Sequence, residues 1–201
     1  MKKLILSYLL MLFIANMGTA QEKIGTLRQL EECTHRPNHQ SEGCPDLDNI
    51  TYVKDVENRL DKFVGTWTGT YNGKTYTFKL NKRVKFGFGQ RNGLYWDRLI
   101  GRMKVQGANG EVLYNTLSES NDSNTYFHGD NFQRNSYIMD FIVNTYCNDS
   151  GVVFLRIYDN QPNKMKVLFD RDRTWYDPKK CPNYETYETT LPQVSFVLTK
   201  Q

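Results

Sequence analysis

The chain has 201 residues and carries 26 Lys and Arg against 22 Asp and Glu, a formal charge of +4. That length suits one domain with one sizeable core, and the near balance of charge argues against a general nucleic-acid-binding protein. Aromatic residues make up 13% of the chain, with 13 Tyr and 11 Phe, which argues against disorder and favours half-buried β-structure. Composition therefore indicates a fold class and assigns no activity.

The first twenty residues have the composition of a secretory signal peptide. Lys2 and Lys3 form a basic start, Leu4–Ala15 is an apolar run, and Gly18-Thr19-Ala20 supplies small residues before a cut. The run covers about 12 residues, whereas a bilayer-spanning helix needs roughly 20, so a signal is favoured over a membrane anchor. We predict a signal peptide at 1–20, no transmembrane segment, and export to the periplasm or the extracellular space.

Four cysteines, Cys33, Cys44, Cys147 and Cys181, lie beyond the predicted signal. An even number in an exported chain predicts two disulfides, and three pairings are open. We favour Cys33–Cys44 and Cys147–Cys181, because the first pair lies in an N-terminal segment distinct from the later strands.

His35 and His39 lie between the first two cysteines, so two thiolates and two imidazoles are available to ligate zinc. In an oxidising compartment, a disulfide with two solvated histidines is favoured instead. We therefore expect no metal and no cofactor.

Helical spacing occurs twice in the N-terminal segment, residues 21–62. It predicts a short helix near 23–33 and one or two further helical turns near 53–63, with a loop at 34–50 between them. The apolar positions are Ile24, Leu27 and Leu30 in the first and Val53, Val56, Leu60 and Phe63 in the second. Asp55, Glu57 and Asp61 would then face water.

From residue 63 to the end the hydrophobic period is two, which predicts strands. Six aromatic or aliphatic residues of 74–88 share one parity: Tyr76, Phe78, Leu80, Val84, Phe86 and Phe88. A two-residue hairpin at Asn81-Lys82 would reverse this parity, so we predict one long strand, with any bend at Lys82.

Asn-Gly dipeptides and other turn signals divide residues 63–201 into strand-like runs. These runs are 65–71, 74–88, 94–106, 111–118, 125–132, 136–147, 152–159, 164–170 and 193–199. Sequential strands joined by short turns predict an all-β domain at 63–201, an antiparallel meander that closes into a barrel of about 8–10 strands. Residues 171–192 contain three prolines and no clean period, so we expect a long surface loop pinned by Cys181.

The segment Asp61–Gly69, with Gly65-Thr66-Trp67 after a predicted helix, resembles the start of a lipocalin-type barrel. The resemblance implies that Trp67 closes one barrel end and that a late cation packs on its ring, for which Lys200 is the candidate. A helix that lipocalins keep between the last two strands is missing from the pattern. The chain from Phe63 also resembles small exported bacterial proteins of unknown function with a similar Tyr-Trp-Asp-Arg-Leu-Ile-Gly segment at 95–101.

Two surfaces of the predicted barrel are candidate binding sites. The aromatic row Tyr71, Tyr76, Phe78, Phe86 and Phe88 either lines a cavity for an apolar ligand or fills the barrel interior. Lys79, Arg83 and Lys85 share the opposite face of the long strand. That basic face is either a solvated strand surface or a site for an anionic partner, such as a lipid headgroup or a surface polysaccharide.

Two further residues raise the question of catalysis. Asp97 has the parity of inward-facing residues, and a structural ion pair with another strand is favoured over acid–base chemistry. His128 has no nucleophile paired with it in the sequence. A hydrolase would require an inward acid pair or a His–acid pair in one cleft.

These observations predict a non-catalytic, lipocalin-like exported protein that binds a small hydrophobic molecule. The alternative is an exported interaction module that binds a surface glycan, lipid or protein through its basic strand face. Neither reading predicts an enzyme or a nucleic-acid partner.

Overall fold

The computed structural model describes residues 22–87, 94–121, 126–173 and 176–201. The predicted signal peptide and Phe88 lie outside the described residues. Within these ranges, no helix combines the length and the apolar character needed to cross a membrane.

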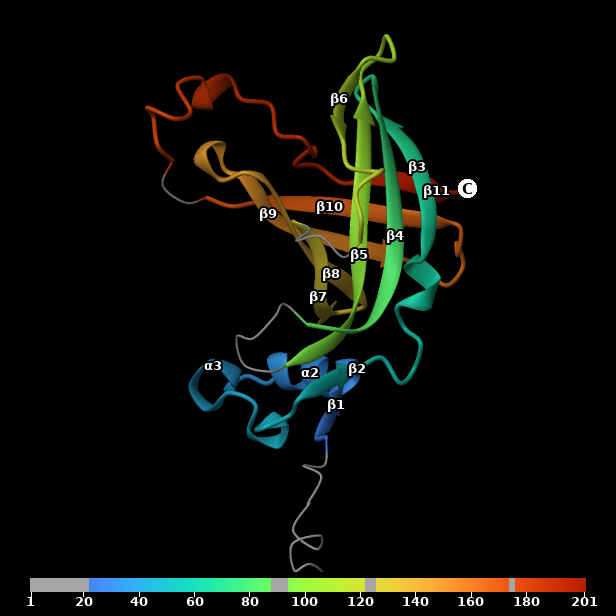
Figure 1. Cartoon of the computed structure of the whole chain (residues 1–201), viewed down its shortest axis with the longest axis vertical. Helices are drawn as coiled ribbons and strands as arrows, with labels where there is room; N and C mark the ends of the chain where they lie inside the picture. The colour runs from blue at the N-terminus through green and yellow to red at the C-terminus, as the bar shows by residue number, and fades with distance from the viewer. Residues whose placement is uncertain (1–21, 88–93, 122–125, 174–175) are drawn as a thin grey trace, which may run out of the picture.

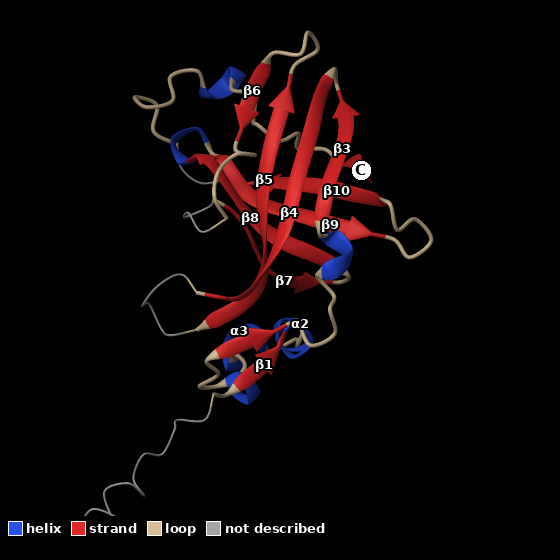
Figure 2. Ribbon diagram, turned by 45° about the vertical axis from the view of Figure 1, so that its right-hand side comes forward, coloured by secondary structure: helices blue, strands red, loops and turns tan. Residues whose placement is uncertain are grey.

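Most of the regular structure is β-strand, and the helices are short (Figures 1 and 2). The strands of the main sheet are β3 (Gly65–Tyr71), β4 (Lys74–Phe86), β5 (Tyr95–Gln106), β7 (Phe127–Gln133), β8 (Ser136–Asn144), β9 (Asp149–Ile157), β10 (Lys164–Arg171) and β11 (Phe196–Lys200). The remaining elements are β1 (Ile24–Thr26), α2 (Leu27–Thr34), α3 (His39–Glu42), β2 (Tyr52–Lys54), β6 (Val112–Asn115) and the 3-10 turns η1 (Pro45–Leu47), η2 (Asp61–Phe63), η3 (Thr145–Cys147) and η4 (Tyr184–Thr186).

The main sheet closes on itself. Each of its strands pairs antiparallel with the next along the chain, β11 returns to β3 at Thr199 opposite Thr68, and β5 meets β7 at Ile100 opposite His128. Eight strands of the described residues therefore form a closed antiparallel barrel, which confirms the predicted fold class. The hairpin strand β6 extends from β5 outside the ring.

In the long strand β4, the alternation of buried and exposed side chains holds over the first part of the strand and breaks down near its end. Tyr76, Phe78 and Leu80 are buried in the barrel as predicted, and β4 runs unbroken over 13 residues. A bulge between Arg83 and Phe86 then shifts the register. Val84 is 66% exposed as a result, so its predicted inward direction is wrong.

The N-terminal segment is only partly helical. The predicted first helix is present as α2, which begins with a capping box between Thr26 and Gln29. The second predicted helical segment is only partly present. The 3-10 turn η2 forms its end, Asp61–Phe63, whereas β2 occupies its start and pairs in parallel with both β1 and the start of β5. Val53 is fully buried opposite Trp96, so its apolar character serves a strand.

Trp67 lies near the barrel end where the chain enters β3, and it is fully buried. Its indole Nε1 donates a hydrogen bond to the Phe63 carbonyl oxygen at 2.7 Å. Lys200 of the last strand places its Nζ 5.2 Å from the Trp67 ring centroid. The cation and the indole are therefore arranged as the lipocalin resemblance implies.

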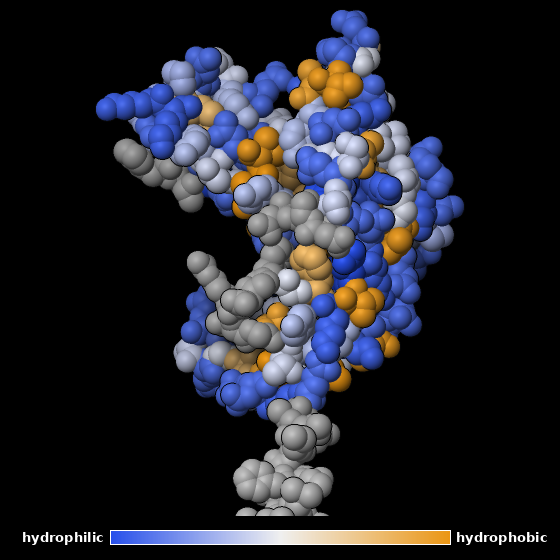
Figure 3. Space-filling view, viewed as in Figure 1, coloured by the Kyte–Doolittle hydropathy of each residue, from blue (hydrophilic) through white to orange (hydrophobic). Residues whose placement is uncertain are grey.

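The structure forms both of the favoured disulfides. Cys33–Cys44 joins α2 to the residue before η1, with the Cα atoms 5.8 Å apart. Cys147–Cys181 joins the loop before β9 to the segment between β10 and β11, with the Cα atoms 5.3 Å apart. In Figure 1 that segment extends away from the barrel, and Figure 3 shows the molecule hollowed between it and the N-terminal segment.

Replacing Trp67 with Ala should lower the free energy of unfolding by about 3–5 kcal/mol, because a large buried side chain leaves a cavity and an unpaired carbonyl. Chemical denaturation measures this directly. Val84→Ala, at an exposed position of the adjacent strand, is the matched control and should change stability little. A Trp67→Ala protein as stable as the control would show that Trp67 does not hold the barrel end together.

Candidate functional site

Aromatic rings fill the barrel interior around Phe78. The Phe78 ring packs edge-on against Phe127, with centroids 5.4 Å apart, and Phe127 packs in the same way against Phe141. Phe141 continues the series to Phe169 at 5.6 Å. A Cβ built on Gly101 would lie 2.2 Å from the Phe127 ring, so even a methyl group has no room there. Around Phe78, the aromatic row therefore fills the barrel interior, which is one of the two alternatives that the sequence left open.

Two other members of the aromatic row, Tyr71 and Tyr76, line a cavity at the far end of the barrel from Trp67. This end, formed by the β3–β4 turn, β6 and residues 187–193, is called the barrel mouth below (Figure 1). The first cavity has a volume of about 280 Å³. Tyr76 is almost wholly buried and Tyr71 is 37% exposed, so one ring forms the floor and the other the rim.

A second cavity of about 290 Å³ adjoins the first. It lies between β6 and the segment before β11, where Tyr114 and Leu113 face Thr190. Lys74 and Glu188 line both cavities, and Lys74 Nζ lies 2.6 Å from Glu188 Oε2. This ion pair therefore stands at the boundary between the two cavities.

A buried carboxylate holds the wall of the mouth in place. Asp149 accepts hydrogen bonds from the Tyr187 hydroxyl at 3.1 Å and from the Thr190 hydroxyl at 2.7 Å. The Thr190 backbone N–H also donates to this carboxylate. Leu191 is fully buried beside them, and Cys147–Cys181 anchors the same segment further back. A stretch without regular structure is thereby fixed against the barrel.

The phenols of the mouth are neutral hydrogen-bond donors at neutral pH. Burial raises the pKa of Tyr76, with a smaller contribution from the Glu188 charge, and burial also raises the pKa of Tyr114. Burial and the neighbouring Asp149 raise the pKa of Tyr187 to about 12. In contrast, the hydrogen bond from Lys74 lowers the pKa of Glu188, which stays ionised. The mouth thus combines ring surfaces, hydroxyl groups and one ion pair.

The predicted basic face is divided by the β4 bulge. Lys79 is exposed on the outer face of β4, and the guanidinium of Arg83 lies 5.9 Å from the Phe86 ring centroid. Lys85 has φ 51° in the bulge and turns toward the N-terminal segment, where its Nζ lies 2.9 Å from Glu22 Oε1. The expectation that all three cations share one face is therefore wrong. Phe86, half-buried beside the bulge, lies apart from the mouth as well.

Asp97 is buried and has a structural role, as favoured from the sequence. Its carboxylate accepts hydrogen bonds from the Tyr52 hydroxyl at 2.6 Å and from the backbone N–H groups of Asp55 and Lys85 at 2.9 Å. These three donors come from β2, the turn after it and the β4 bulge. Asp97 thereby attaches the N-terminal segment to the barrel through hydrogen bonds, where an ion pair was expected.

Asp55 completes this junction, and its predicted exposure is wrong. It is 4% exposed, and it accepts hydrogen bonds from the backbone N–H groups of Arg59 and Leu60. Lys82 Nζ lies 3.0 Å from Asp55 and 2.7 Å from Asp61. Burial opposes the charge of Lys82, but these two hydrogen bonds raise its pKa overall.

His128 belongs to a charged cluster on the outer face of the barrel. It pairs with Asp140 across β7 and β8, and its Nδ1 lies 3.6 Å from Asp140 Oδ2. Burial and the positive charge of Arg98 lower the pKa of His128. Burial raises the pKa values of Asp130 and Asp140. A His–acid pair is therefore present, but it lies outside the residues that form the mouth.

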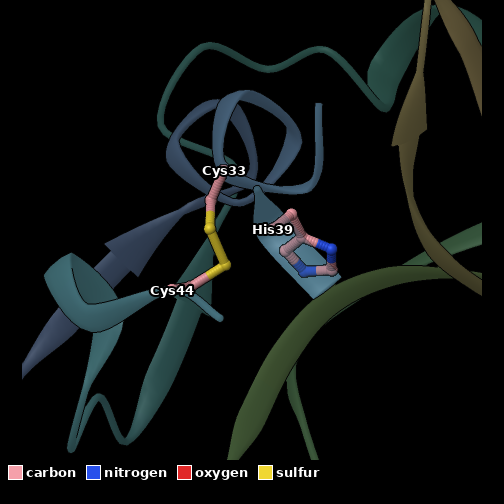
Figure 4. A group of neighbouring side chains, drawn as sticks. All are labelled: Cys33, His39 and Cys44. Atoms are coloured by element: carbon pink, nitrogen blue, oxygen red, sulfur yellow. A yellow bond between two sulfur atoms is a disulfide. The ribbon is translucent and has the colours of Figure 1, made fainter. Parts of the chain in front are cut away.

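The possible zinc ligands are arranged differently from a metal site. Ligand atoms of Cys33, His39 and Cys44 lie within 4.8 Å of one another, but the two sulfur atoms are bonded to each other (Figure 4). A disulfide offers no thiolate to a metal ion. His35 is exposed, and its Nδ1 lies 2.6 Å from the Glu31 carbonyl oxygen.

The whole chain, residues 1–201, matches a family of unknown function, DUF6705. The chain belongs to this family. No curated protein and no solved structure matches the chain. Because membership in DUF6705 assigns no activity, the function has to be argued from the geometry of the mouth.

Sequence reasoning found two residues of the mouth and missed the others. Tyr71 and Tyr76 follow the period of two, whereas Glu188 lies in the stretch without a period. Lys74 is one of 26 Lys and Arg residues, and no local pattern distinguishes it from the others. The signal that could have found the site is the Tyr-Glu-Thr-Thr segment at 187–190, just ahead of the last strand, which combines ring, charge and hydroxyl groups.

Tyr52→Phe should lower the free energy of unfolding by about 1–3 kcal/mol, because the buried Asp97 carboxylate loses a charge-assisted hydrogen bond. Urea denaturation provides the measurement. Tyr95→Phe removes an exposed hydroxyl next to the same junction and should leave stability within about 0.5 kcal/mol. Equal stabilities of both variants and the parent would argue against a role for Asp97 in attaching the segment.

His128→Gln should reduce the loss of stability on acidification below about pH 6.5. The unfolded chain takes up this proton near 6.5, the ordinary pKa of histidine, and the folded chain only at lower pH. The unfolded state then binds more protons, so the free energy of unfolding falls as pH drops through this window. The aspartates act with the opposite sign, because their raised pKa values let the folded state bind these protons at higher pH than the unfolded state does. Denaturation at pH 5 to 7.5, with His35→Gln as control, measures the slope; an unchanged slope in His128→Gln contradicts the prediction.

Proposed function

We propose that the chain is an exported, non-catalytic protein that binds a small amphipathic molecule containing an aromatic ring at the barrel mouth. The observation that carries this proposal is the pair of adjoining cavities, about 280 and 290 Å³, lined by tyrosine rings. Together they fall within the range of about 300–1,000 Å³ that small-molecule sites occupy. The lipocalin resemblance supports a carrier role. The rings that fill the interior support the mouth as the binding site over the inside of the barrel.

The lining supports an amphipathic ligand over a purely apolar one. Tyr71, Tyr76 and Phe196 form a group of rings, with the Tyr76 and Phe196 centroids 5.0 Å apart. Hydroxyl groups of Tyr187 and Thr189 lie beside these rings. Such a site stacks one flat face of a ligand and hydrogen-bonds its polar edge.

The described residues of the mouth include no activated nucleophile, which supports a binding role over catalysis. Among the described residues that line the two cavities there is no Ser, Cys or His, and the two charged residues neutralise each other. The threonines have hydrogen-bond partners within the wall, such as Thr190 with Asp149. Nothing in this lining activates a hydroxyl group for attack.

Export is supported by the composition of residues 1–20 and by the disulfides. A basic start, an apolar run and small residues at the predicted cut are typical of a signal peptide. Two disulfides persist best in an oxidising compartment outside the cytosol. A ligand carrier in that setting meets small molecules from the surroundings of the cell.

Isothermal titration of the mature protein with 1-naphthamide, a neutral bicyclic amide, tests the proposed function. We expect saturable binding at about micromolar to millimolar concentration, which Thr189→Trp should abolish by obstructing the part that the two cavities share. Tyr71→Ala should weaken it about three- to tenfold, because a stacking ring is lost.

Tyr158→Ala removes a comparably exposed ring that lines neither cavity of the mouth, and it is the matched control. Thermal melts establish that each variant folds. The proposal fails if the parent gives no heat of binding, or if Thr189→Trp folds and still binds as the parent does.

A further inference from the structure

Lys74 is a cation fixed by the barrel at the centre of the mouth. It is the first residue of β4, its Cα is paired with Tyr71 across the β3–β4 hairpin, and its side chain is 28% exposed. It lines both cavities, so an atom placed in either one lies close to its stem or ammonium group. Its ion-pair partner, Glu188, lies outside the barrel strands.

Glu188 lies in a segment without regular structure, and its side chain is 79% exposed. Its neighbours Tyr187 and Thr190 are held by Asp149, but the Glu188 carboxylate itself contacts Lys74 from the solvent side. Exposed ion pairs contribute little free energy, because water solvates both charges when they separate. Rotation of one side chain is therefore enough to release the ammonium group of Lys74, without any change in the backbone.

The surroundings of Lys74 suit an anion that is attached to a ring. Lys74 and Glu188 are the two charged groups among the described residues that line the cavities, so no other acid there competes for the ammonium group. The Tyr76 hydroxyl is a neutral phenol that donates a hydrogen bond, which a carboxylate oxygen accepts, whereas the Tyr187 hydroxyl already donates to Asp149. The ring faces of Tyr71 and Tyr76 lie within the same cavity.

We propose that the ligand of the mouth is a small aromatic carboxylate, whose carboxylate displaces Glu188 from Lys74 while its ring lies against Tyr71 and Tyr76. This inference rests on the proposed function and specifies the ligand class. Glu188 is then a tethered competitor that occupies the anion position in the empty protein. Its departure also opens the boundary between the two cavities, so that a ligand of two rings has access to both.

Two substitutions separate this inference from simple stacking. Glu188→Gln keeps the shape of the side chain and removes its charge, so the affinity for an aromatic carboxylate should rise roughly two- to fivefold, the factor that an exposed ion pair represents. Lys74→Gln removes the cation, so that affinity should fall at least about tenfold. A neutral analogue has no charge to pair with either residue, so its affinity should change less than that of the carboxylate in both variants.

The experiment titrates the mature protein with 1-naphthoate and with 1-naphthamide, which share the same ring system and differ in charge. Parent, Glu188→Gln and Lys74→Gln are compared with two controls, Glu185→Gln in the same segment and Lys164→Gln on an exposed part of β10. Thermal melts verify folding, and repetition at higher salt should weaken naphthoate binding alone.

Tighter binding of naphthoate than of naphthamide, strengthened by Glu188→Gln and lost in Lys74→Gln, supports the inference. Equal binding of both probes, unaffected by either charge substitution but lost in Thr189→Trp, overturns it and leaves the proposed function standing. Failure of both probes to bind the folded parent removes the proposed function, and this inference with it.

Discussion

The volume enclosed by the barrel strands limits where this protein can bind a ligand. An eight-stranded barrel has a narrow interior, which is either filled by the side chains of its own strands or holds one small ligand. Here phenyl rings take that space, from Phe78 through Phe127 and Phe141 to Phe169 in successive edge-on contacts. Small residues such as Gly101 make room for these rings on facing strands. Among the described residues this part of the barrel is a packed core, which favours a ligand site at an end of the barrel over one within these rings.

The two ends of the barrel are built in different ways. At one end Trp67 is fully buried, donates to the Phe63 carbonyl and is covered by the ammonium group of Lys200. Every polar atom named there has a partner, which suits an end that stays closed. At the other end the ring layer finishes in tyrosines, and a segment outside the sheet forms the wall. The asymmetry between a sealed end and a hydroxyl-rich end is what makes the mouth the better candidate site.

The fold could be predicted from the sequence because the buried face of each strand repeats every second residue. The barrel strands were located to within a few residues, and Gly65-Thr66-Trp67 marked the start of the first of them. Prediction failed where burial follows no local period. Val53 lies in a three-residue strand paired with distant β5, and Asp55 is buried because Lys82 and backbone N–H groups surround it. The partners Trp96 and Lys82 lie far along the chain from Val53 and Asp55, outside a local window of sequence.

Only those residues of the candidate site that lie in strands could be predicted from the sequence. Tyr71 and Tyr76 belong to strands and follow the alternation, whereas Glu188 belongs to a stretch whose position depends on Asp149, nearly forty residues earlier. Burial raises the pKa of Asp149, so this carboxylate is held at a cost that its hydrogen bonds to Thr190 and Tyr187 offset. A disulfide at Cys181 shortens the free part of the same stretch. The stretch that shows no hydrophobic period is thus held in place by both a buried carboxylate and a disulfide. Barrel stability alone does not readily explain why both of them act on the segment that forms the mouth.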